Sequence, residues 1–197
     1  MRSLAEKIVL PVSGETAFRV ISDLNTLLRL SPFFTLKKIE SSKEGVAQKE
    51  GLFKITIEYY EKNISETYPV EVDAYEVNRR ISYSIGDGIV KNVIYEINDD
   101  ETGIQLTQTF LLASEDEAAV KSARNELHFW LRSVGEYVKL AEGKSFLKRA
   151  QKSFMDRIWL RLTLSERNIA IIMVKISVLE IVLLLVIVLI WNIGMRS

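Results

Sequence analysis

Few residues of this chain could carry out chemistry. Its 197 residues include one histidine, His128, and no cysteine. One imidazole with scattered carboxylates is a poor zinc site, and a chain without cysteine has no thiolate nucleophile and no disulfide framework. A lone helical histidine such as His128 is usually a packed or surface residue. The sequence therefore predicts no metal centre and no cofactor.

Two further sequence motifs would indicate catalysis: a glycine-rich phosphate-binding loop and a serine nucleophile motif. Gly86-Asp87-Gly88 lies between two expected strands with no helix after it, so we expect a tight turn rather than a phosphate-binding loop. There is no Gly-x-Ser-x-Gly nucleophile motif. Acid–base catalysis by Asp, Glu or Tyr stays open, because such partners are defined only in three dimensions. The sequence favours binding over catalysis, with a cyclase- or hydrolase-type enzyme as the lesser alternative.

Four residues with a polar group, Tyr59, Tyr83, Tyr95 and Gln108, lie at positions where the alternation of apolar and polar residues along the expected strands predicts a buried side chain. A buried hydroxyl or amide needs a hydrogen-bond partner. That partner is either the polar group of a ligand or another of these side chains in a filled core, and both alternatives stay open. The candidate lining of an apolar cavity is Ile57, Tyr59, Val72, Tyr83, Tyr95, Gln108, Phe110, Leu127, Trp130 and Val134.

These residues belong to segments with the repeat of a half-buried sheet. After a first strand at 3–12, the pattern of alternating apolar and polar residues recurs at 52–60, 68–77, 80–85 and 104–112. Turn residues separate the segments. Alternating residues indicate a sheet with one buried face and one solvent-exposed face, which is typical of antiparallel sheets, so we expect an antiparallel sheet.

Helices flank this run of strands. Ser13 opens a first helix, and Asp23 or Asn25 can cap a second short one. Ser114-Glu-Asp-Glu has the form of a capping box before a long helix, and Gly143 is a plausible end for that helix. Apolar residues at spacings of three and four predict that one stripe of the long helix faces the sheet.

The resulting order is a strand, two short helices, about six antiparallel strands and a long amphipathic helix, which is an α+β arrangement. It resembles the helix-grip fold of the START-like (SRPBCC) superfamily. In that fold a curved antiparallel sheet of about seven strands wraps a long C-terminal helix and encloses a cavity. The resemblance is carried by KIVLPVSGETAFRVISDLNTLLRLSPFF, the strands through residue 113 and the helix from Glu115 to Ala141, and it covers 1–143. Within the superfamily, proteins like the G subunit of carbon monoxide dehydrogenase join such a domain to a C-terminal membrane segment, and this chain is similar in layout.

The end of the sequence is almost wholly apolar. The segment 176–193 contains the uninterrupted apolar run IVLLLVIVLIW at 181–191, and its eighteen residues would span roughly 27 Å as a helix, close to the thickness of a bilayer's hydrocarbon core. Starting the span at Ile169 places Lys175 and Glu180 inside it. A buried core helix is the alternative, but 181–191 has no polar face. We expect a transmembrane anchor at 169–193 and a short tail at 194–197.

A basic, aromatic segment precedes the anchor. Residues 144–168 contain seven Lys and Arg against two Asp and Glu, whereas residues 1–143 contain 17 against 23. The acidic body argues against a nucleic-acid partner. Basic residues beside a membrane span favour its cytoplasmic side, so we expect 1–143 in the cytoplasm and an amphipathic juxtamembrane helix at 144–168, with a linker helix in solution as the alternative. The residues expected at the membrane interface are Lys148, Arg149, Lys152, Arg157, Trp159, Arg161 and Trp191.

Besides a cyclase- or hydrolase-type enzyme, the sequence supports two functional hypotheses. The first is a membrane-tethered domain that binds or carries an apolar ligand such as a lipid, isoprenoid or quinone; its partners are membrane lipid and the ligand. The second, which the likeness in layout to the carbon monoxide dehydrogenase proteins suggests, is a docking protein that recruits a cytoplasmic enzyme complex to the membrane. The sequence favours the first.

Overall fold

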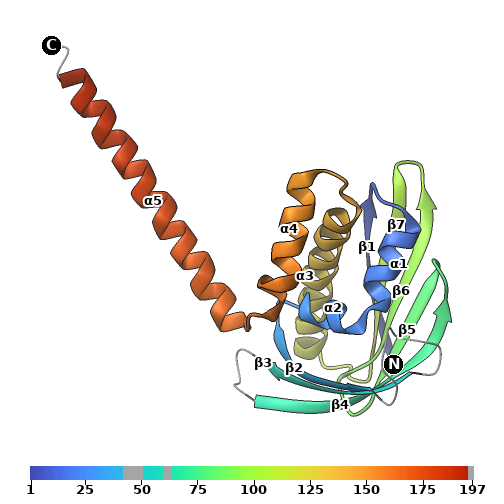
Figure 1. Cartoon of the computed structure of the whole chain (residues 1–197). Coiled ribbons are helices and arrows are strands. Elements are labelled where there is room, and N and C mark those ends of the chain that lie inside the picture. Colours follow the sequence, from blue (N-terminus) through green and yellow to red (C-terminus); the bar gives the residue numbers. More distant parts are fainter. Residues whose placement is uncertain (42–50, 60–63, 195–197) are drawn as a thin grey trace. The chain divides into compact units, whose positions relative to one another are not determined.

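The computed structural model describes residues 1–41, 51–59 and 64–194, without the side chains of 188–190 and 192–194. The predicted tail at 194–197 therefore lies almost entirely outside the described residues. The elements appear in Figure 1. The strands are β1 (Arg2–Leu10), β2 (Phe34–Ser41), β3 (Leu52–Tyr59), β4 (Ile64–Glu76), β5 (Arg80–Ile85), β6 (Val90–Asp100) and β7 (Gly103–Leu112). The helices are α1 (Gly14–Ser22), α2 (Leu24–Arg29), α3 (Glu117–Glu142), α4 (Phe146–Arg157), the 3₁₀ turn η1 (Trp159–Arg161) and α5 (Leu164–Gly194).

The seven strands form one antiparallel sheet in the order β1-β7-β6-β5-β4-β3-β2. The predicted alternation is confirmed: along β7, every second residue from Ile104 to Leu112 is buried. The register shifts within the β2–β3, β4–β5 and β6–β7 pairs. Such irregularities bend strands and increase their twist, which gives the sheet its curvature.

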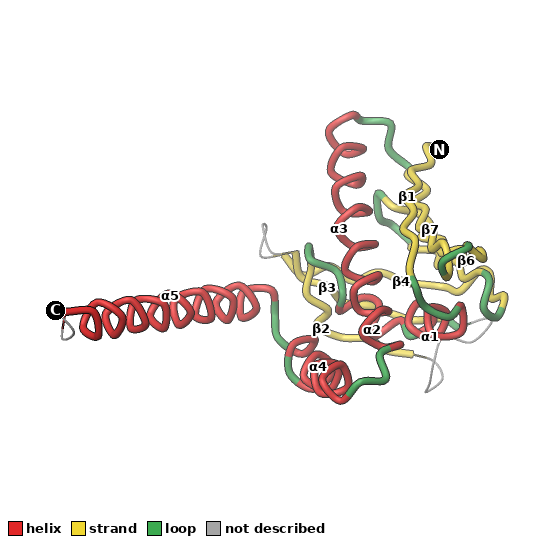
Figure 2. Tube along the Cα trace, turned by 90° about the horizontal axis from the view of Figure 1, so that it is seen from above, coloured by secondary structure: helices red, strands yellow, loops and turns green. Residues whose placement is uncertain are grey.

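The long helix α3 lies along the concave side of this sheet, in contact with β1 and β7 (Figure 2). The predicted apolar stripe faces inward, and Leu127, Val134 and Val138 are fully buried. Helices α1 and α4 also contact α3. The α+β helix-grip architecture expected from the sequence is thus confirmed.

Caps and turns agree with the sequence in part. Ser13 caps α1 and Asp23 caps α2, each accepting a hydrogen bond from the third residue after it. The long helix begins later than expected, because its N-cap is Asp116, which accepts from Ala119. The Ser114 hydroxyl instead accepts a hydrogen bond from the Asp116 backbone nitrogen, so Ser114 belongs to the loop that precedes the N-cap. Asp87 has a φ of 61°, consistent with the expected tight turn at 86–88.

The prediction of one continuous helix at 144–168 is wrong, because α4 ends at Arg157 and α5 begins only at Leu164. Leu160, in the following turn, is buried in the body and its carbonyl accepts a hydrogen bond from Arg29. Helix α5 then begins directly after Thr163, which exchanges hydrogen bonds with Glu166 in the pattern of a capping box. The break exists because burial of Leu160 pulls the chain into the body.

The chain divides into two compact units, the body Met1–Arg161 and a second unit that begins at Leu162. Among the described residues one helix is long and apolar enough to cross a membrane: within the stretch Leu164–Ile187 of α5, the most apolar window of 18 residues has a mean hydropathy of 2.8 and none of that window is buried. By length and composition, α5 is a candidate membrane span.

Candidate ligand-binding sites

The ten predicted cavity residues all lie on the inner side of the body. Nine are buried and Tyr59 is partly buried. They come from β3, β4, β5, β6, β7 and α3, so residues up to 77 positions apart in the sequence lie around one core.

Tyr95 and Gln108 are direct cross-strand neighbours on β6 and β7. The Gln108 amide nitrogen donates a hydrogen bond of 2.8 Å to the Tyr95 oxygen, and neither residue is exposed. The other atom of the amide, Gln108 Oε1, has no hydrogen-bond partner among the residues that the structure describes. The sequence singled out both residues, but only the fold shows that their pairing leaves one polar atom unsatisfied.

The surroundings of this pair are apolar. On β6 the neighbours on the same face are Val93 and Ile97, and on β7 they are Leu106 and Phe110. A buried carbonyl oxygen without a donor costs about 1–3 kcal/mol. The Gln108 oxygen is therefore a buried acceptor without a donor among the described residues.

Tyr83 and Trp130 are satisfied by the protein itself. The Tyr83 hydroxyl donates to the Ile21 carbonyl at 2.7 Å, and Trp130 Nε1 donates to the Leu27 carbonyl at 3.0 Å. Both acceptors lie in the last turns of short helices, and the Leu27 carbonyl also accepts from the Leu30 backbone nitrogen at 3.3 Å. Burial raises the pKa of Tyr83 and of Tyr95 well above the ordinary value, so both hydroxyls stay neutral. The Tyr83 and Trp130 hydrogen bonds join α1 and α2 to the body.

Aromatic rings fill one flank of the interior. Trp130 packs edge-on against Phe34 and Phe110, with ring centroids 5.6 Å and 6.2 Å away. The Tyr59 ring also packs edge-on against Phe34, with the two ring centroids 6.2 Å apart. Three of the aromatic residues predicted to line a cavity, Tyr59, Phe110 and Trp130, are thus linked through ring contacts, two of which involve Phe34, a residue not predicted from the sequence.

Glu126, a partly buried residue of α3, was not predicted from the sequence as a site residue. Burial raises the pKa of its carboxyl group to about 7. The pKa of the nearby Tyr59 is raised by burial and, to a lesser degree, by the Glu126 charge. Glu126 follows Ala123 by three residues, so the helical repeat that predicted the buried stripe could have placed it at the stripe's edge.

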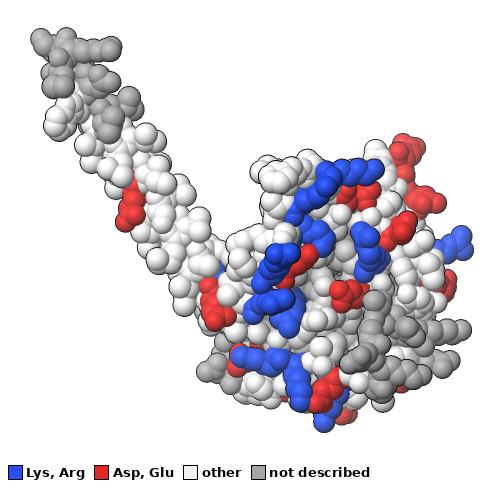
Figure 3. Space-filling view, in the orientation of Figure 1, with Lys and Arg blue, Asp and Glu red and all other residues white. Residues whose placement is uncertain are grey.

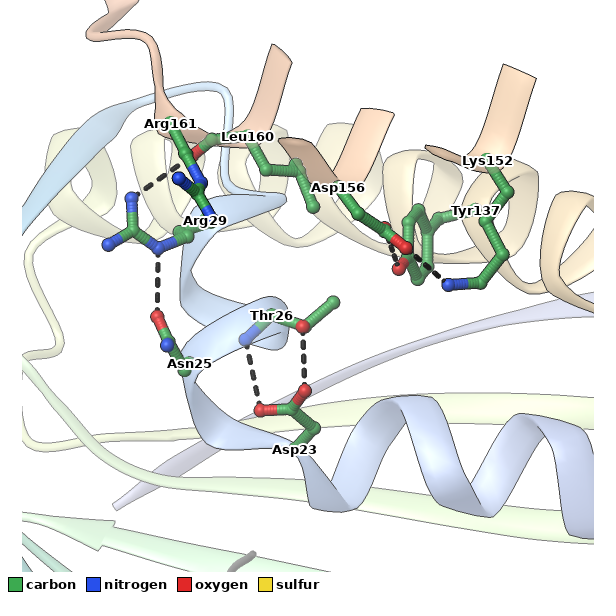
Figure 4. A pocket seen from close by; sticks show the side chains of 9 residues that line it. All are labelled: Asp23, Asn25, Thr26, Arg29, Tyr137, Lys152, Asp156, Leu160 and Arg161. Atoms are coloured by element: carbon green, nitrogen blue, oxygen red, sulfur yellow. Dashed lines mark hydrogen bonds and ion pairs between the residues drawn. The ribbon is translucent and has the colours of Figure 1, made fainter. Parts of the chain in front are cut away.

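A second site is a polar cleft of about 630 Å³ on the outside of the body, where α2, α3, α4 and η1 meet (Figure 4). It is lined by Asp23, Asn25, Thr26, Arg29, Tyr137, Lys152, Asp156, Leu160 and Arg161. Its carboxylates have partners inside the cleft. Asp23 accepts from the Thr26 hydroxyl, and Asp156 accepts from both Tyr137 and Lys152. Burial and then the Asp156 contact raise the pKa of Tyr137.

Two arginines meet at the other end of the cleft. Arg29 donates to the Asn25 side chain at 2.8 Å and to the Leu160 carbonyl at 3.0 Å. Burial, and then the charge of Arg161, lower the pKa of Arg29. Arg161 is exposed and its side chain extends toward Arg29 (Figure 4).

The predicted membrane-interface residues divide into two sets. Lys148, Arg149, Arg157 and Arg161 are exposed, and lysine and arginine side chains gather on the face that α4 forms (Figure 3). Exposed apolar residues Phe146 and Leu147 lie on the same helix. The remaining three differ among themselves: Lys152 is bound to Asp156, Trp159 packs against the core, and Trp191 is exposed on α5.

His128 forms an exposed contact of 2.9 Å with Glu6. Within 1–41, 51–59 and 64–194, no three His, Cys, Asp or Glu side chains lie in a group that could hold a metal ion.

Comparison with known proteins gives the fold but no family. No protein-family model and no curated protein matches the chain. Among solved structures, protein CV1439 from Chromobacterium violaceum matches with a TM-score of 0.55 and 14% identity, over 71% of this chain and 99% of its own. The Aha1 dimer from Colwellia psychrerythraea matches with a TM-score of 0.52 and 12% identity, over 73% of this chain and 100% of its own.

Ara h 8.0201 is a third similar structure, with a TM-score of 0.51 and 16% identity over 70% of this chain and 97% of its own. At these identities the likeness concerns the fold alone, and it agrees with the helix-grip architecture. These structures are matched over almost their whole length, so more than a quarter of the present chain has no counterpart in them.

Proposed function

We propose that the chain is a membrane-tethered helix-grip domain that binds an apolar molecule with one polar group, such as a lipid, isoprenoid or quinone. The observation that carries the proposal is Gln108 Oε1, which no donor among the described residues satisfies in an apolar interior. A hydroxyl group on the ligand would donate to this oxygen. If the amide is turned over, Oε1 accepts from Tyr95 and the amide nitrogen can donate to a ligand carbonyl instead.

The tether is the other half of the proposal. Helix α5 supports it by its length, its hydropathy and its exposed apolar surface. The exposed basic residues of α4 support a cytoplasmic body, because such residues favour the cytoplasmic side of a membrane. Tethering would keep the domain at a high effective concentration beside the membrane in which apolar ligands dissolve.

Ligand binding can be tested with residues 1–161, the first compact unit. The truncated protein, purified without detergent, is extracted with organic solvent and the extract is analysed by mass spectrometry. We expect one apolar compound class in near-stoichiometric amount, reduced at least about tenfold in Gln108→Leu, as expected for the loss of one buried hydrogen bond. Gln105→Leu is the matched control, because Gln105 lies on the same strand but on its other face. An extract without any such compound contradicts the proposal.

Tethering is tested by fractionation of cells that express the full chain. We expect the full chain in the membrane fraction after an alkaline carbonate wash, and residues 1–161 in the supernatant. Recovery of the full chain from the soluble fraction without detergent would refute the tether.

A second candidate function is the recruitment of a cytoplasmic enzyme complex, by analogy with the carbon monoxide dehydrogenase proteins of similar layout. The excess of Asp and Glu in residues 1–143 favours a basic partner surface. If this function holds, residues 1–161 capture one defined complex, and reversing acidic surface charges abolishes the capture. Recovery of lipid alone leaves it unsupported.

Glu126 is the observation that favours an acid–base enzyme, since a carboxyl group with a pKa near 7 can exchange protons at neutral pH. We propose instead that Glu126 borders the ligand site without a catalytic role. Glu126→Gln should then retain the bound compound unchanged, whereas accumulation of a chemically different compound in this variant would support the enzyme.

A further inference from the structure

The polar cleft between α2 and α4 contains three basic side chains, those of Arg29, Lys152 and Arg161. Lys152 is held by Asp156 and lies 5.4 Å from the centre of the Tyr137 ring. Asp23 is engaged as the cap of α2. Arg161 differs from these residues: it is exposed, and among the described residues its guanidinium has no side-chain partner.

Arg29 is fixed in place beside it. Hydrogen bonds to Asn25 and to the Leu160 carbonyl orient the Arg29 guanidinium, so this side chain needs little further ordering to bind a ligand. Two guanidinium groups that converge on one cleft repel each other. An anion between them would remove the repulsion and accept hydrogen bonds from both.

We propose that this cleft is a phosphate-binding site in which Arg29 and Arg161 hold a phosphate group. Arginine suits this role because its planar fork of donors matches phosphate oxygens, in contrast to the point charge of lysine. Burial, and to a lesser degree the charge of Arg161, lower the pKa of Arg29, and a bound anion would oppose the second of these two effects. Lys152, at the opposite end of the cleft, supplies additional positive potential.

The size of the cleft decides which part of a ligand fits. A volume of about 630 Å³ exceeds what a bare phosphate needs and is in the range of sites for small organic molecules. The phosphate can therefore belong to a lipid headgroup or to a soluble phosphate compound. Arg161 precedes the first residue of α5 by three positions along the chain, which favours the headgroup if α5 spans a membrane.

The test uses the full chain in dodecyl maltoside micelles and isothermal titration calorimetry. The titrants are inorganic phosphate, short-chain phosphatidic acid and, as an apolar control, short-chain diacylglycerol. Saturable binding of phosphate or phosphatidic acid supports the site. Binding of phosphatidic acid alone identifies a lipid headgroup, and binding of both identifies a site for phosphate in general.

Arg161→Gln should weaken the binding at least about tenfold, which corresponds to the loss of a charge-assisted hydrogen bond. Arg161 is exposed, so this variant should fold; Arg29→Lys is the second variant, which keeps the charge but loses the fork. Arg149→Gln and Arg157→Gln remove the same charge from exposed positions of α4 that do not line the cleft, and should leave the binding of inorganic phosphate unchanged. The proposal is overturned if neither phosphate titrant binds, or if the control variants weaken binding as much as Arg161→Gln does.

This site is separate from the interior pair of Tyr95 and Gln108. Loss of the interior ligand in Gln108→Leu should leave phosphate binding intact. The inorganic phosphate titration also needs no membrane, so a failure of the tether and a failure of the phosphate site can be told apart.

Discussion

Replacing Tyr95 by Phe and Gln108 by Leu, singly and together, distinguishes a ligand-binding pair from a pair that only stabilises the core. Tyr95→Phe removes the acceptor of the Gln108 amide nitrogen and leaves the whole buried amide unsatisfied. This change should lower the free energy of unfolding by about 1–3 kcal/mol. Gln108→Leu removes the unsatisfied oxygen but isolates the Tyr95 hydroxyl, so we expect a smaller loss of about 0–2 kcal/mol.

The double variant should be more stable than the sum of the single changes predicts. It replaces both polar partners by apolar groups of similar shape, which is often nearly neutral for stability. The coupling free energy between the two positions should therefore be about 1–3 kcal/mol in favour of the double variant. The size of this coupling follows from complete burial of both side chains, because water cannot compensate either one.

The assay is urea denaturation of delipidated residues 1–161, followed by tryptophan fluorescence. Bound ligand stabilises the folded state, so it must be removed before the variants are compared. Lipid extraction of the same variants gives the second readout: we expect the double variant to fold well but to recover little ligand. Additive single effects would show that the pair is not coupled, and full ligand recovery by the double variant would refute its role in binding.

Three further predictions follow from the geometry of the body. The free energy of unfolding of Glu126→Gln, relative to that of the wild type, should increase by at most about 3 kcal/mol as the pH rises from about 4.5 through about 7. The carboxyl pKa is raised in the folded state, so ionisation of Glu126 destabilises the wild type over this range and cannot occur in the variant. Urea midpoints of both proteins measured from pH 4 to pH 8 test the prediction, and a difference between the midpoints that does not change with pH would contradict it. Leu160→Ala should lower the free energy of unfolding of residues 1–161 by about 2–4 kcal/mol, because Leu160 is buried; Leu147→Ala, at an exposed position, should have little effect in the same denaturation. Gly103→Ala should lower the thermal midpoint by several degrees. The reason is that Gly103 has a φ of +149° and an added Cβ would lie 2.2 Å from the Leu10 carbonyl oxygen. An unchanged thermal midpoint, measured by circular dichroism, would show that the β6–β7 turn relaxes freely.

The sequence was sufficient for the α+β fold class and for much of the candidate interior. Alternation with a period of two placed Tyr95, Gln108 and their apolar neighbours on the inner face, because side-chain direction in a strand is set by the backbone alone. The stripe of α3 followed in the same way from the helical repeat, and the hydropathy of 169–193 followed from composition. Each of these properties depends on residues that are close together in the chain.

Boundaries were predicted less well where a tertiary contact competes with a local signal. The segment 144–168 was expected to be one amphipathic helix, although Arg157 and Arg161 interrupt its apolar side. The helix breaks after Arg157 because Leu160 is buried against the body. For the same reason Trp159 packs against the core instead of standing with the exposed basic residues. The capping pattern of Thr163 and Glu166 is a local signal that would have marked the start of α5.

Only the tertiary structure decided which polar groups meet. Arg29 and Arg161 are 132 positions apart, and nothing local to either residue indicates that they face one cleft. Likewise, the sequence could nominate Gln108 as a buried amide, but whether its oxygen finds a donor depends on every strand and helix packed around it. Periodicity is determined by backbone geometry within a few residues, whereas the partners of a side chain are determined by how the whole chain packs.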